Sequence, residues 1–122
     1  MLKIRPEQFA VFQKASSESF QDRMVSHIKQ FFPQSMEQLG EPAIRDLIHY
    51  GIQRSATYQF RLEPDVCNYI DFMVVFGRDF DRDPALPWAS SILNNPSLQG
   101  PSVRVAELHK AAAALESSQG GE

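Results

Sequence analysis

The chain has 122 residues, of which 43% are hydrophobic and 22% charged, which is typical of one globular domain and excludes a disordered chain. Its net charge of −3 argues against a nucleic-acid partner, which needs a basic face, and against attraction to an anionic membrane. Glu7 and Gln8 interrupt any apolar run behind the N-terminal basic residues, so no signal peptide is expected. We therefore expect a cytoplasmic protein that binds neither nucleic acid nor membrane.

The first segment repeats apolar residues at every third or fourth position from Phe9 to Phe31, which is the spacing of one helix face. Pro6 suits the first turn of such a helix, and Pro33 ends it. At about 1.5 Å per residue, the helix would span about 39 Å. The pattern predicts a long N-terminal helix that forms the backbone of the fold.

The next segments are shorter. A helical turn is expected at Gln34 to Leu39, and Pro42 opens the second main helix. Gly51 lies in the apolar stripe of that helix, where glycine costs about 1 kcal/mol relative to alanine. It therefore marks either a close helix crossing or the helix end. Thr57 to Glu63 alternates polar and apolar residues, and without a partner strand we interpret it as an extended connector.

The third main helix is predicted between Pro64 and Gly77, and it is apolar on nearly all faces, so it should be the most buried. Asp83 resembles the N-cap of a short fourth helix from Pro84 to Leu93. A last helix follows Ser102.

The fold class is all-α, a compact bundle of about four to five helices in a single domain at residues 1–116. Residues 117–122 are rich in glycine and serine, and we expect them to form a disordered tail.

Three alternating aspartates, Asp79, Asp81 and Asp83, resemble the start of a calcium loop. The rest of the loop does not fit, because Pro84 stands where glycine is required and Ser90 where a bidentate glutamate is required. We interpret the segment as helix capping and a solvated acidic loop.

The other residues that could bind a metal or take part in catalysis form no catalytic pattern. His27, His49 and His109 lie on three different predicted helices, without a further ligand at metal-binding spacing on the same face. Cys67, the single cysteine, lies among apolar residues and is expected to be a buried, inert thiol. A phosphate-binding glycine loop and a nucleophile elbow are both absent from the sequence. We expect no enzymatic activity, no cofactor and no metal.

The strongest candidate for partner binding is the stretch that contains the only tryptophan. Its candidate residues are Asp79, Phe80, Asp81, Arg82 and Trp88. In one interpretation Trp88 covers the core and fixes the loop. In the other these residues form a binding patch, since tryptophan and arginine are enriched at hot spots. Both can hold, because a fixed loop can display Phe80 and Arg82 outward.

The segments Asp65 to Asp71 and Gly77 to Ala89 resemble a group of small bacterial proteins encoded beside type VI secretion effectors and their spike or PAAR components. The likeness covers roughly residues 9 to 95, and its weaker part runs through Arg23-Met24, His27, Phe32-Pro33 and Gly51-Ile52. The resemblance implies a helical cytosolic co-chaperone or adaptor that helps an effector, or the effector's chaperone, to load onto the spike. It implies a protein partner and no catalytic residues.

Two other classes of function remain open from the sequence. One is an immunity protein that blocks a neighbouring toxin, because such proteins are often small and acidic. The other is an enzyme, for which the aspartate cluster is the only support. The oligomeric state is not determined by the sequence.

Overall fold

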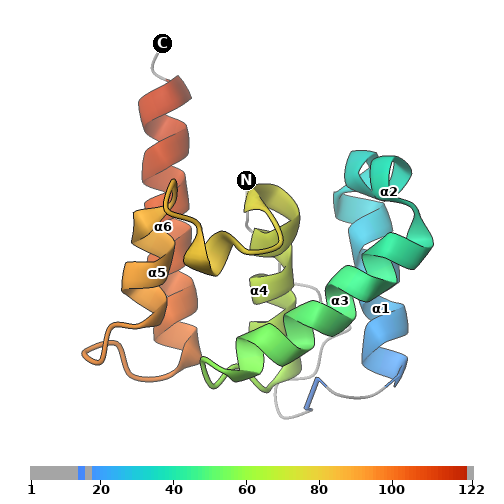
Figure 1. Ribbon diagram of the computed structural model, residues 1–122, viewed down its shortest axis with the longest axis horizontal. Helices are drawn as coiled ribbons and strands as arrows, with labels where there is room; N and C mark the ends of the chain where they lie inside the picture. Colours follow the sequence, from blue (N-terminus) through green and yellow to red (C-terminus); the bar gives the residue numbers. More distant parts are fainter. Residues whose placement is uncertain (1–13, 16–17, 121–122) are drawn as a thin grey trace.

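Six α-helices and one 3-10 turn make up the part of the chain that the computed structural model describes, which is residues 14–15 and 18–120 (Figure 1). The elements are α1 (Glu18–Phe31), α2 (Pro33–Leu39), α3 (Glu41–Ala56), α4 (Glu63–Phe76), η1 (Phe80–Arg82), α5 (Pro87–Leu93) and α6 (Pro101–Gly120). The described residues form no named strand. The all-α class is therefore confirmed, and the helices are more numerous than the four to five expected.

The prediction of a long N-terminal helix is wrong. Helix α1 begins only at Glu18 and has 14 residues, whereas α6, with 20 residues, is the longest described helix. Lys14 instead forms an isolated antiparallel β-bridge with Leu62, and the N–H of Ala15 donates to the carbonyl of Arg61 at 2.9 Å. The connector predicted at Thr57 to Glu63 is extended only in part, because residues 57–59 form turns and α4 begins at Glu63. Its residues Arg61 and Leu62 have a backbone partner that the sequence did not reveal. The predicted helical residues up to position 13 lie outside the described part of the chain.

Helix α4 forms the centre of the domain. Figure 1 shows it between α1 and α3 on one side and α5 and α6 on the other, and it packs against α1, α3, α6 and η1. Residues 66–73 are all buried, so the prediction that this helix is the most buried is confirmed. An unbroken buried stretch of two turns requires neighbours on all sides, and the surrounding helices provide them.

Gly51 lies where α3 crosses α4. A Cβ atom at this position would lie 2.7 Å from Cγ1 of Ile70 and 2.9 Å from Sδ of Met73. Since α3 continues to Ala56, the glycine marks the close crossing and not the helix end.

Glycine and proline set most helix boundaries as predicted. Gly77 ends α4 with a φ of +116°, a backbone conformation that side chains other than glycine rarely adopt. The start of α5 was predicted wrongly at Pro84, because the helix begins at Pro87. The Asp83 carboxylate accepts the N–H of Ala85 at 2.9 Å in a local turn and does not cap the helix.

Helix α6 ends at Gly120, within the segment 117–122 that was expected to form a tail, and the disorder of that tail stays a prediction. None of the described helices combines the length and the apolar character that a membrane span requires.

Candidate functional site

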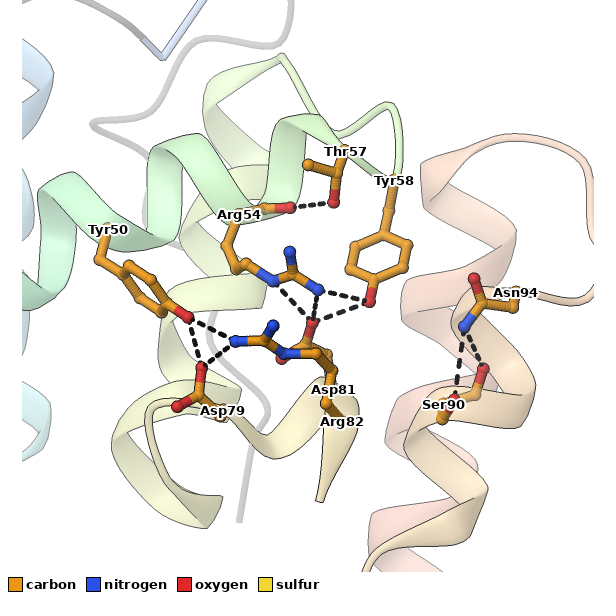
Figure 2. Close-up of polar contacts among 9 residues, drawn as sticks. All are labelled: Tyr50, Arg54, Thr57, Tyr58, Asp79, Asp81, Arg82, Ser90 and Asn94. Atoms are coloured by element: carbon orange, nitrogen blue, oxygen red, sulfur yellow. Dashed lines mark hydrogen bonds and ion pairs between the residues drawn. The ribbon is translucent and has the colours of Figure 1, made fainter. Parts of the chain in front are cut away.

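Four of the predicted partner-binding residues, 79–82, lie on the connection between α4 and α5, beside α3 (Figure 2), whereas Trp88 lies in the first turn of α5. They do not form one exposed patch. Phe80 and Asp81 are fully buried and Trp88 is partly buried, whereas the side chains of Asp79 and Arg82 are 52% and 56% exposed. The expectation that Phe80 faces outward is therefore wrong.

Phe80 anchors the loop in the aromatic part of the core. Its ring centroid lies 5.1 Å from that of Tyr69 and 5.9 Å from that of Phe72. Trp88 makes a T-shaped contact with Phe76 at 5.3 Å, consistent with the interpretation that the tryptophan covers the core. These contacts fix the loop at both ends, so it has a defined shape before any partner binds.

Asp81 is a second buried anchor. Arg54 donates to its Oδ2 from Nε at 2.8 Å and from Nη2 at 2.6 Å, and the Tyr58 hydroxyl donates to the same oxygen at 2.7 Å (Figure 2). Burial and the hydrogen bond to Asp81 raise the pKa of Tyr58 to about 12. Arg54 and Tyr58 are four residues apart, which brings both side chains to one side of the chain at the end of α3. The interpretation of Asp81 as part of a solvated acidic loop is wrong.

The exposed side of the loop carries a second polar network. The Tyr50 hydroxyl donates to Asp79, and Nη2 of Arg82 donates to Tyr50 Oη at 3.0 Å and to Asp79 Oδ1 at 2.9 Å (Figure 2). The hydrogen bonds from Tyr50 and Arg82 lower the pKa of Asp79. Arg78 places its guanidinium 4.0 Å from the centre of the Tyr50 ring and lies 3.4 Å from the carboxylate of Asp46. We call these five residues the arginine face.

A different group of side chains meets in the interior between α1 and α4. Nε2 of His27 lies 2.9 Å from Oδ1 and 3.2 Å from Oδ2 of Asp71, and Sγ of Cys67 lies 3.7 Å from the same nitrogen. All three residues are at most 2% exposed. We call them the His27 cluster. Cys67 and Asp71 are one helical turn apart on α4, a spacing that was visible in the sequence, but the histidine comes from another helix.

The His27 cluster does not have the geometry of a thiol nucleophile with its base. In such triads the nucleophile and the carboxylate contact different ring nitrogens, whereas Cys67 and Asp71 both contact Nε2. Burial, together with the negative charges of Asp71 and Glu63, raises the pKa of the Cys67 thiol. The thiolate is therefore disfavoured, in line with the expected inert cysteine.

The remaining histidines have ordinary surroundings. His49 is exposed and lies 3.3 Å from the side-chain nitrogen of Gln53, and His109 lies 3.3 Å from Oδ1 of Asn68. Neither joins the His27 cluster.

Comparisons with protein-family models, with curated proteins and with solved structures give no match. Two features of the described residues therefore bear on function: the anchored loop with its arginine face, and the His27 cluster in the interior.

Proposed function

We propose that the protein is a cytosolic accessory protein of type VI secretion, a co-chaperone or adaptor that binds an effector or its chaperone during loading onto the spike. The resemblance of Gly77 to Ala89 supplies the system. The observation that carries the binding role is the arginine face, which lies on a loop held in place by Phe80 and Asp81.

The anchored loop supports this proposal through the entropy of binding. A segment that is already ordered loses little conformational freedom when a partner binds. Phe80 packs in the core and Asp81 pairs with Arg54, so the exposed side chains on either side of these two residues start from a fixed backbone. The loop therefore needs little rearrangement to present Arg78 and Arg82.

The charges of the arginine face support an acidic partner surface. Arginine is enriched at binding hot spots and forms directional bonds to carboxylates. Arg78 and Arg82 pair with Asp46 and Asp79 at exposed positions, where ion pairs contribute little to stability. A partner carboxylate can replace these intramolecular partners at little cost to the fold, and this favours orientation more than affinity.

The test is co-purification from a bacterium that carries a type VI secretion system, with the full chain as bait. Phe80→Ala is unsuitable, because it would damage the core. The double variant Arg78→Gln and Arg82→Gln removes two charges and keeps the anchors, and recovery of the partner should fall by about tenfold or more. The matched control is Lys29→Gln with Lys110→Gln, which removes two exposed charges on α1 and α6.

The identity of the partner decides between the two functions. An effector or effector chaperone supports the adaptor. The catalytic domain of a toxin would instead assign the immunity role. Unchanged recovery with the arginine variant, at an unchanged melting temperature, would show that the arginine face is not the interface.

A further inference from the structure

The His27 cluster brings together three kinds of side chain that bind transition metals. Its imidazole nitrogen, thiol sulfur and carboxylate oxygen all lie within 4.8 Å of one another. Around a tetrahedral zinc ion, nitrogen and oxygen ligands lie about 3.3 Å apart, and nitrogen and sulfur ligands about 3.5 Å apart. The corresponding distances here are 2.9–3.2 Å and 3.7 Å. Small side-chain movements would bring these donor atoms around one ion.

With protons alone, Nε2 of His27 can form a good hydrogen bond with only one of its two neighbours, Asp71 and Cys67, at a time. If Nε2 of His27 carries a proton, it donates to Asp71, and the Cys67 thiol then faces a nitrogen that cannot accept its hydrogen. If Nε2 carries no proton, its single lone pair accepts either from the Cys67 thiol or from a protonated Asp71 carboxyl group, but not from both. A cation is attracted to the nitrogen, the sulfur and the oxygen at the same time, because each can act as an electron-pair donor.

The donor set selects the ion. A thiolate ligand disfavours magnesium and calcium, which prefer oxygen, whereas zinc binds cysteine, histidine and aspartate. A thiolate and a carboxylate also neutralise the two charges of Zn²⁺, and a neutral site is what a fully buried position requires. Both oxygens of Asp71 face Nε2 of His27, so a bidentate carboxylate can complete four ligands from the described residues.

We propose that His27, Cys67 and Asp71 form a structural zinc site that links α1 to α4. No zinc-binding pattern was visible in the sequence, because the ligands come from two helices. The cluster is closed to solvent, so the ion enters as the chain folds, and zinc binding stabilises the folded state. A bound zinc ion would hold the Cys67 sulfur as a thiolate, as it does other coordinating thiols.

The test uses the full chain, unfolded in guanidinium chloride with a chelator and then refolded with either zinc or the chelator. Refolding matters because a closed site exchanges its ion slowly. We expect about one zinc per chain by elemental analysis, and a melting temperature at least about 5 °C higher than in the chelator sample. Refolding with Co²⁺ should give the charge-transfer absorption of a cobalt–thiolate bond.

Cys67→Ala removes one ligand and leaves the His27–Asp71 pair, and zinc affinity should fall by at least about 100-fold, with loss of the cobalt–thiolate band. His49→Gln is the control, since it removes an exposed histidine and should leave zinc binding unchanged. The proposal would be overturned if wild-type protein refolded with zinc contained no zinc and had the same melting temperature as the sample refolded with chelator. This outcome does not depend on whether the Cys67 variant folds. Zinc binding by Cys67→Ala as tight as that of the wild type would also overturn it.

Discussion

Asp81 is the residue whose position in the structure differs most from the one predicted from the sequence. Its carboxylate accepts hydrogen bonds from Arg54 and Tyr58 in a fully buried position. Asp81→Ala leaves these two donors without their acceptor, so it should lower the free energy of unfolding by about 2–4 kcal/mol. Equilibrium unfolding in urea measures this loss.

Asp79→Ala is the matched control for this prediction, because it makes the same chemical change two residues earlier in the loop. Its partner Arg82 is exposed, and the loss should be much smaller. Equal losses for the two variants would contradict the assignment of Asp81 as the anchor.

Tyr58 gives a test at alkaline pH. Its pKa is raised from 10.0 in the unfolded chain to about 12 in the folded protein. The unfolded chain therefore ionises first, and the stability that Tyr58 contributes is fully present below about pH 10 and is lost as the pH rises towards about 12. Tyr58→Phe lacks this loss, so the stability gap between wild type and variant should narrow by about 1 kcal/mol between about pH 8 and about pH 11. A gap that stays constant in urea unfolding would show that burial and the hydrogen bond to Asp81 do not raise the pKa of Tyr58 in the folded protein.

At the scale of elements, the crossing of α3 and α4 depends on the absence of a side chain at Gly51. Alanine would gain about 1 kcal/mol in helix propensity, but its Cβ would overlap with Ile70 and Met73. Overpacking of this kind outweighs the gain, and Gly51→Ala should destabilise the protein by about 1–3 kcal/mol. Gln53→Ala, on the exposed side of the same helix, should change stability by less than about 0.5 kcal/mol. A stabilising effect of Gly51→Ala in thermal unfolding would refute the close crossing.

Helix α4 allows a sharper test of the core. Met73 is 1% exposed, and Met73→Asp places an unpaired charge in the interior, so the variant should lose more than about 4 kcal/mol or fail to fold. Val75 lies two residues further along and is 47% exposed, so Val75→Asp should lose less than about 1 kcal/mol. Circular dichroism during heating compares the two, and similar melting temperatures would mean that α4 is not the central helix.

At the scale of the whole molecule, the features that the sequence predicted are those that depend on neighbouring residues. Gly77 ends α4, and α1 ends at Phe31, two residues before Pro33, through local backbone preferences, so both helix ends were predicted correctly. The apolar surface of α4 is likewise a property of a single segment, and it predicted the burial of that helix.

The features that were missed depend on side chains or backbone from distant parts of the chain. The bridge between Lys14 and Leu62 joins residues 48 positions apart in the sequence, and it shows that the chain before α1 is extended at that point. The acceptor for Arg54 lies 27 residues away, and the carboxylate beside His27 lies 44 residues away. Periodicity within one segment contains no information on such pairs, so the buried role of Asp81 and the His27 cluster became visible only in the folded structure.

The central claim is that the arginine face contacts a protein partner. Hydrogen–deuterium exchange of the full chain, with and without the co-purified partner, tests it most directly. Within 77–83, the amides of Phe80, Arg82 and Asp83 donate to carbonyls three residues earlier, and such short-range bonds outside an α-helix open more readily than those of a long helix. We predict that the partner slows exchange at 77–83, while exchange in α6 is unchanged. Slower exchange confined to α6, with 77–83 unaffected, would contradict the claim.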